Sequence, residues 1–203
     1  MSIEVKISRN KVPYKKSMFI LEKRVEDVQK GLKKEFLWIL EHPTTYTGGI
    51  RSSDNEILDK KIKIIKTNRG GKITLHNPGQ KIIYFVINLN KRKKDIRLFI
   101  QNIEKSIIEF LKVYNINAFA DRKNIGIWVK DKKISAIGIK VKRWIAFHGC
   151  SININNNLNH YKKIIPCGLD NKKVTSVLEL ISVKPKKFEN NLANIFIKNI
   201  NNI

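Results

Sequence analysis

The stretch that decides the fold is IGIWVKDKKISAIGIKVKRWIAFHGCSINI, which runs from Ile125 to Ile154. It is dense in β-branched and aromatic residues, and short charged breaks divide it into runs of strand length. The runs that we interpret as strands are Ile125–Val129, Ile134–Val141 and Trp144–Ile154, with Asp131 and Lys132 in the first turn. Successive strands with short connections pair as neighbours, so this stretch predicts a meander within one sheet.

Two helices are predicted on the N-terminal side of this stretch. Between Asp95 and Tyr114 an apolar stripe recurs at helical spacing, formed by Ile96, Phe99, Ile103, Ile107, Phe110 and Tyr114. The stripe indicates a helix that covers one side of the sheet. Ser17 to Lys30 carries a second stripe after Pro13, formed by Met18, Leu21, Val25 and Val28.

The rest of the chain divides into shorter strands, loops and weaker helices. Predicted strands are Phe36–Leu40, Ile62–Ile65 and Ile82–Leu89, and predicted helices are Val174–Leu180 and Asn191–Ile200. Turn-forming or polar residues predict loops at Thr44–Gly49 and Arg69–Gln80, and charge predicts solvated loops at Lys91–Lys94 and Lys184–Lys187. This mixture predicts an α/β or α+β single domain over residues 1–203, with a mixed β-sheet flanked by helices.

The charge of the chain is large but has two explanations. The 203 residues include 41 basic and 17 acidic side chains, for a net charge of +24. Such a charge fits nucleic acid, an anionic membrane or acidic proteins as partners, whereas 34 isoleucines and only 5 alanines indicate AT-rich codon drift. Trp38, Phe85, Phe99 and Trp144 lie in apolar runs and are predicted in the core. We therefore expect no nucleic-acid partner.

The compartment follows from the start of the chain and from the cysteines. Met1 to Lys6 lack the apolar run of an export signal, and no run approaches the length of a membrane span. Cys150 and Cys167 are the only cysteines, so a disulfide framework is not expected. These features predict a cytoplasmic protein with reduced thiols and no membrane partner.

Two interpretations of Cys167 stay open from the residues alone. The cysteine lies in Ile165-Pro166-Cys167-Gly168, where glycine allows a tight turn beside the sulfur. As a nucleophile it would need a nearby cation or base, because the ordinary pKa of a thiol is about 8.5. As a structural residue it would be a small buried hydrophobe. Cys150 follows His148-Gly149 in a predicted strand, which favours the buried interpretation there.

Lys133 also has two interpretations. It begins the run Lys133–Gly138, whose following residues are small and apolar. If its ammonium points inward, desolvation would lower its pKa and suit the side chain to proton transfer. The alternative is a lysine beside a hairpin turn, in water.

The segment from Arg69 to Gln80 contains a diglycine, and glycine lets backbone N–H groups approach a ligand. It matches neither a P-loop nor the dinucleotide-binding glycine pattern. His76 has two interpretations, a residue that shapes a ligand site or a hydrogen-bonded loop histidine, and the residues alone favour the second. The four histidines show no metal-ligand spacing, so we expect no metal.

Taken in order, four blocks of this chain resemble the lipoyl(octanoyl) transferases, the octanoyl-acyl carrier protein:protein N-octanoyltransferases of lipoate biosynthesis. The blocks are Glu41-His42-Pro43 with Tyr46-Thr47, Arg69-Gly70-Gly71 with Thr74 and His76, Lys133–Gly138 with Trp144 and His148-Gly149, and Pro166-Cys167-Gly168 with Val174-Thr175-Ser176. They span about residues 35–180. The resemblance implies the catalytic fold of the biotin and lipoate protein ligases.

The resemblance also assigns roles to residues. It implies that Cys167 is the acyl-accepting nucleophile and that Lys133 poises it. It further implies that the acyl substrate is bound by Arg69, Gly70, Gly71, Lys72, Ile73, Thr74, Leu75, His76, Ala136, Ile137, Gly138, Gly149, Cys150 and Ser151. Two residues depart from the family pattern: Asn77 replaces a glycine of the histidine-containing turn, and Cys150 replaces a small residue other than cysteine.

The activity implied is transfer of an octanoyl group from octanoyl-acyl carrier protein to the target lysine of lipoyl domains, through a thioester on the enzyme. The implied acceptors are the lipoyl domains of 2-oxoacid dehydrogenase E2 subunits and the glycine cleavage H protein. Exchange of a thioester for an amide is downhill, so no cofactor is expected. The alternatives are an ATP-dependent lipoate or biotin protein ligase, which needs no nucleophilic cysteine, and a basic nucleic-acid-binding protein.

Overall fold

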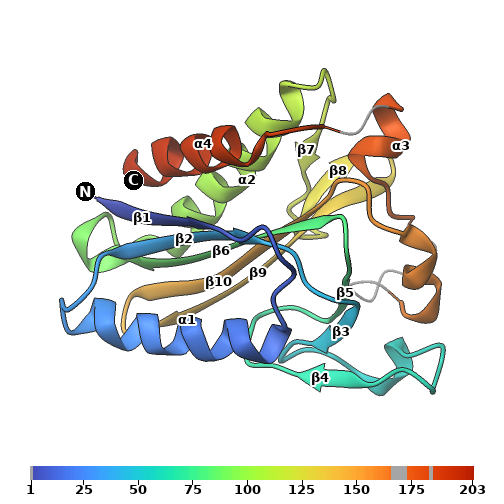
Figure 1. Cartoon of the computed structure of the whole chain (residues 1–203), viewed down its shortest axis with the longest axis horizontal. Coiled ribbons are helices and arrows are strands. Elements are labelled where there is room, and N and C mark those ends of the chain that lie inside the picture. The colour runs from blue at the N-terminus through green and yellow to red at the C-terminus, as the bar shows by residue number, and fades with distance from the viewer. Residues whose placement is uncertain (1, 166–172, 183–184) are drawn as a thin grey trace.

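The computed structural model describes residues 2–165, 173–182 and 185–203. Within these ranges the main element is a mixed sheet of seven strands in the order β1-β2-β6-β10-β9-β8-β7. Its strands are β1 (Ile3–Ile7), β2 (Glu35–Leu40), β6 (Gln80–Asn88), β7 (Phe119–Ala120), β8 (Ile127–Val129), β9 (Lys132–Lys142) and β10 (Ile145–Asn153). The helices are α1 (Tyr14–Gln29), α2 (Ile96–Lys112), α3 (Val177–Ile181) and α4 (Glu189–Asn201). Helix α1 covers one face of the sheet, and α2 and α4 cover the other (Figure 1).

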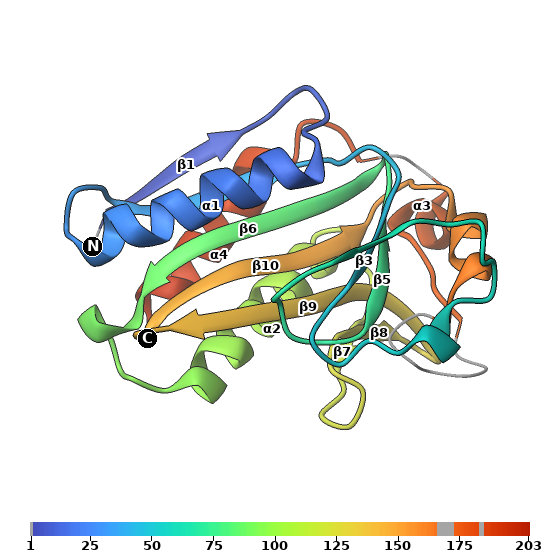
Figure 2. The same cartoon turned by 90° about the horizontal axis from the view of Figure 1, so that it is seen from below.

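The predicted meander is confirmed. Strands β8, β9 and β10 pair antiparallel in succession, and β10 also pairs antiparallel with β6. The mixed sheet flanked by helices is therefore present as predicted, with β9 and β10 near its centre (Figure 2).

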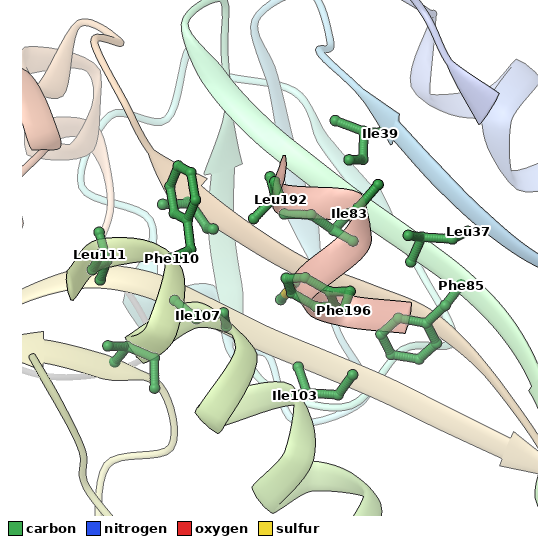
Figure 3. Packing of buried hydrophobic residues seen from close by; sticks show 14 of the residues in the cluster. Leu37, Ile39, Ile83, Phe85, Ile103, Ile107, Phe110, Leu111, Leu192 and Phe196 are labelled. Carbon is green, nitrogen blue, oxygen red and sulfur yellow. The ribbon is translucent and has the colours of Figure 1, made fainter. Parts of the chain in front are cut away.

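The larger core lies between the sheet and the helices α2 and α4. Phe99, Ile103, Ile107 and Phe110 of the predicted stripe are buried, and the Asp95 carboxylate caps α2 by accepting a hydrogen bond from Leu98 N at 3.0 Å. Figure 3 shows the side chains of α2, among them Ile107 and Phe110, facing Ile83 and Phe85 of β6 and Leu192 and Phe196 of α4. The first stripe residue, Ile96, is exposed because it lies in the first turn of the helix, beyond the edge of the sheet contact.

A smaller core lies between α1 and the opposite face of the sheet. Leu21, Val25 and Val28 of the predicted N-terminal stripe are buried there against Trp38 and Tyr84. This packing holds the start of α1, including Tyr14, beside β6.

A second sheet includes the predicted strand Ile62–Ile65, observed at Ile64–Lys66, and has two further strands within the predicted loops. Its strands are β3 (Thr45–Gly48), β4 (Ile64–Lys66) and β5 (Ile73–His76), in the order β4-β3-β5, and β5 turns directly into β6 (Figure 2). The loop prediction was wrong because polar side chains such as Thr47 and His76 are buried here through hydrogen bonds, which a hydrophobicity pattern does not reveal.

Four other expectations differ from the structure. Strand β1 was missed, and its pattern IEVKI pairs parallel with β2 at the sheet edge. Trp144 is exposed at the turn between β9 and β10, where its φ of +63° turns it away from the core. Arg92 is not solvated, since its side chain is inaccessible and donates to Glu35. Val174 pairs with Lys133 instead of starting a helix.

Candidate active site

A cavity of about 580 Å³ runs past β9 and β10 and contains most of the predicted site residues that the structure describes. Those that line it are Arg69, Gly70, Gly71, Lys72, Thr74, His76, Lys133, Ala136, Ile137, Gly138, Gly149, Cys150 and Ser151. Ile73 and Leu75 do not, because side chains alternate along β5 and these two point into a core with Tyr46, Tyr161 and Ile164. The volume is typical of a pocket for a small-molecule ligand.

Arg69 fastens the diglycine loop to the second sheet, and Gly70 fastens it to the main sheet. The buried guanidinium donates hydrogen bonds to the carbonyl oxygens of Thr47 and Lys72, at 2.9 and 3.0 Å, and to Thr47 Oγ1 at 2.8 Å. Gly70 N donates to Ile139 O at 3.3 Å, which ties the loop to β9. A Cβ on Gly138 would lie 3.2 Å from Gly70 O, so the glycine permits this close approach. Arg69 therefore shapes the cavity wall.

Lys133 points inward and is buried, which excludes the hairpin lysine in water. Its Nζ donates to Ile125 O at 2.8 Å and lies 5.5 Å from the centre of the Trp128 ring, and the side chain borders the cavity. The backbone of Lys133 pairs with residues 173–175: Lys133 N donates to Lys173 O at 2.9 Å, and Thr175 N donates to Lys133 O at 3.0 Å. The chain immediately after residue 172 is therefore fixed beside Lys133.

The predicted nucleophile, Cys167, lies outside the described residues, as do Pro166 and Gly168. The described residues that flank this segment are both anchored near the cavity. Ile165 N donates to Glu56 O at 2.8 Å, and Glu56 in turn binds Lys72 of the cavity wall at 3.0 Å. Lys173 is the residue that bonds to Lys133.

A cluster of rings that the sequence analysis did not predict closes one side of the cavity. His76 Nδ1 is 2.8 Å from Gln80 Oε1, and the ring stacks on Tyr14 at 6.0 Å between centroids. His42 Nε2 lies 2.9 Å from the Tyr84 hydroxyl. His76 is thus a strand residue in a buried network, and Tyr14 and Tyr84 line the cavity beside it.

The buried histidines of the site are uncharged at neutral pH. Burial lowers the pKa of His42 to about 4 and the pKa of His76 to about 3, and the proximity of the two rings contributes to the second shift. Burial, with help from Arg69 and Lys140, lowers the pKa of His148 to about 3. His148 lines the cavity, and its Nε2 lies 2.8 Å from Asn68 Oδ1. His76 and His148 therefore line the cavity without adding charge to it.

Cys150 is the buried residue that the strand context predicts. It lies on β10, packs in the larger core and borders the cavity. Burial raises the pKa of its thiol well above the ordinary value, so it stays protonated. A protonated thiol is a poor nucleophile, and Cys150 is a wall residue.

Basic and apolar side chains form the rim of the cavity. Arg51, Arg122 and Lys123 border the cavity and are exposed, and Ile50 and Ile125 are exposed next to them. No group of three His, Cys, Asp or Glu side chains in the described ranges is arranged to hold a metal ion. In the same part of the chain, no helix combines the length and apolarity needed to cross a bilayer.

Known proteins match this chain over most of its length. The family model for the lipoyl protein ligase A/B catalytic domain matches residues 13–197. The octanoyltransferase of Wolbachia pipientis subsp. Culex pipiens (strain wPip) is 43% identical over 183 residues, covering 88% of this chain and 89% of the relative. The octanoyltransferase of Wolbachia sp. subsp. Brugia malayi (strain TRS) is 41% identical over 97% of this chain and 98% of the relative.

A solved structure gives the same fold at much lower identity. It is a bi-partite lipoate protein ligase from Thermoplasma acidophilum, studied with its E2 lipoyl domain. The superposition has a TM-score of 0.74 at 16% identity and covers 99% of this chain and 84% of that chain. At this identity the likeness shows the shared fold.

Proposed function

This chain belongs to the lipoyl protein ligase A/B catalytic-domain family, and we propose that it transfers an octanoyl group from a carrier-protein thioester to a lipoyl-domain lysine through a thioester on Cys167. It is an octanoyltransferase of lipoate biosynthesis, as the four sequence blocks predict. The observation that carries the mechanism is the buried Lys133, which borders the cavity and pairs with the chain that follows residue 172. That arrangement supports a short path between Lys133 and the Cys167 segment.

The chemistry follows in two acyl transfers. The Cys167 thiolate attacks the carbonyl carbon of the octanoyl thioester, and the carrier sulfur leaves as a thiolate that takes up a proton from the Lys133 ammonium. The amine of the target lysine then attacks the acyl-enzyme, an amide forms, and Cys167 leaves as thiolate. The proton lost by the amine passes to Lys133 or to the leaving thiolate. A cation beside the sulfur favours the thiolate, and this is the role proposed for Lys133.

The cavity supports an acyl chain as the ligand. Ile82, Ile100 and Ile137 contribute apolar side chains to its lining, and the neutral histidines add no charge. Each methylene buried there would contribute about 0.8 kcal/mol to binding. An octanoyl group thus has several kcal/mol of binding free energy available from the wall alone.

The rim of the cavity supports acidic proteins as partners. Arg51, Arg122 and Lys123 concentrate positive charge where a carrier protein or a lipoyl domain would have to approach. Such a field speeds encounter with an acidic surface. The proposed donors and acceptors are octanoyl-acyl carrier protein and the lipoyl domains of E2 subunits and the glycine cleavage H protein.

The experiment that tests this function is transfer from octanoyl-carrier protein to an isolated lipoyl domain without ATP, followed by the mass of the lipoyl domain. We expect an octanoyl increment on one lysine. An increment that forms only with free octanoate and ATP would contradict the proposal and favour the ligase alternative. The matched control is a lipoyl domain whose target lysine is replaced by arginine, which should stay unmodified.

A further inference from the structure

Gly126 lies where the side chain of Lys133 must pass. The residue precedes β8 and has a φ of +141°, a conformation that residues with a side chain rarely adopt. A Cβ built on it would lie 2.4 Å from Lys133 Cε and 3.0 Å from Lys133 Nζ. It would also lie 2.6 Å from Ser135 O. The end of the lysine therefore occupies the space that any side chain at position 126 would need.

We call the space that holds the end of the Lys133 side chain the lysine slot. Beside Gly126, it is formed by Ile125 O and the Trp128 ring. Ile125 O accepts the hydrogen bond from Lys133 Nζ at 2.8 Å, and the Trp128 ring covers the ammonium at 5.5 Å. Trp128 Nε1 donates to Asn124 O at 2.9 Å. The ring that covers the ammonium and the carbonyl that accepts from it are thus held by one short segment.

The Asp121 carboxylate forms hydrogen bonds within that segment. Its Oδ1 accepts from Lys123 N at 2.8 Å, and its Oδ2 accepts from Asn124 Nδ2 at 2.8 Å. Asp121 N lies 3.4 Å from Gly126 O, across the loop. The slot walls are therefore fixed by hydrogen bonds that do not depend on Lys133.

We propose that Gly126 is a positioning residue that acts through Lys133. A lysine stem has many rotamers, and the ammonium can poise a thiol only if it is held at one place. Without a Cβ at position 126, the end of the lysine stem has the space beside Gly126, and its ammonium bonds to Ile125 O at the cavity border. This inference rests on the proposed function, in which Lys133 poises Cys167.

The test is a double-mutant cycle of Gly126→Ala and Lys133→Ala, read by single-turnover acylation with octanoyl-carrier protein across pH. Gly126→Ala is expected to slow acylation at neutral pH by about tenfold to 100-fold, because a displacement of about 1 Å has such effects. The acid limb of its pH profile should move to higher pH, since less thiolate is stabilised. In the Lys133→Ala background the same substitution should change the rate by less than about twofold.

Gly31→Ala is the matched control. Gly31 also has a positive φ, +73°, but no atom lies within 4 Å of its missing Cβ, and it is remote from the cavity. Gly31→Ala should lower the free energy of unfolding without shifting the pH profile of acylation. If Gly126→Ala does not fold, the free energy of unfolding replaces the acylation rate as the readout. Adding Lys133→Ala removes two of the three close contacts to the new Cβ, so the double variant should partly recover its folding.

Four results separate the outcomes. The role of Gly126 would be overturned if the acylation rate of the double variant falls by the product of the two single losses. It would also be overturned if Gly126→Ala leaves the acylation rate and its pH profile unchanged. Absence of any rescue in an insoluble Gly126→Ala would overturn it too. Normal acylation by Lys133→Ala would instead contradict the proposed role of Lys133, whatever Gly126→Ala does.

Discussion

Acid should destabilise this protein through three histidines that fold in the neutral form. Burial lowers the pKa of His42 to about 4 and the pKa values of His76 and His148 to about 3. In the unfolded chain each binds a proton as the pH falls through about 6.5. Below that pH the unfolded state therefore binds more protons than the folded state. Stability is full above about pH 6.5 and is lost as the pH falls toward the folded pKa values.

The size of the effect follows from the number of protons. Each histidine adds a slope of about 1.4 kcal/mol per pH unit between the two pKa values. Between pH 6.5 and pH 5, one histidine thus costs about 2 kcal/mol and the three together about 6 kcal/mol. The whole free energy of unfolding of a domain is about 5 to 15 kcal/mol. Mild acid should therefore remove a large share of the stability.

The perturbation is His76→Gln, which replaces an imidazole by an uncharged amide that can still bond to Gln80. Urea unfolding from about pH 7 to about pH 5 gives the free energy of unfolding at each pH. Below about pH 6.5 the parent should lose about 4 kcal/mol per pH unit, and the variant about one third less. A parent slope below about 1.4 kcal/mol per pH unit, or an identical slope in the variant, would refute the reasoning.

Three further predictions concern Lys133, the rim of the cavity and the core. Lys133→Ala should acylate about 100-fold more slowly at neutral pH and recover partly as the pH rises, since more free thiolate then forms; single-turnover rates across pH measure this. Raising salt from low to physiological should raise KM for the carrier protein more than it lowers kcat, and equal effects on both would count against a charged docking rim. Glu35→Ala should lower the free energy of unfolding by about 3 to 5 kcal/mol in urea, because it leaves the buried Arg92 guanidinium without its carboxylate; a loss below about 1 kcal/mol would contradict this.

The parts of the fold that the sequence predicts are those where apolar side chains alone decide the structure. The stripe of α2 is one example, because its buried residues are nearly all hydrophobic. The meander of β8 to β10 is another, because its strands are dense in β-branched and aromatic residues between short charged breaks. Strands β3 and β5 escape such reasoning because Thr47 and His76 are buried through hydrogen bonds to partners far along the chain or on another element. The burial of Arg92 is not predicted for the same reason, since its hydrogen-bond partner Glu35 is 57 residues away along the chain.

The sequence predicts the part of the site that lies within the ordered sequence blocks. The blocks around Arg69, Lys133 and Gly149 meet at one cavity. Tyr14 and Tyr84 were not predicted, because a helix start and a strand centre carry no local signal that they will share a wall. Gly126 was not predicted either, since only the path of the Lys133 side chain shows why that position must lack a Cβ.

The central claim is an octanoyl thioester on Cys167, and the mass of the intact protein after mixing with octanoyl-carrier protein tests it most directly. Cys150→Ala is the matched control, because the second cysteine lines the same cavity with a protonated thiol. We expect an octanoyl increment that is present in the parent and in Cys150→Ala and absent in Cys167→Ala. An increment that survives in Cys167→Ala and disappears in Cys150→Ala would contradict it.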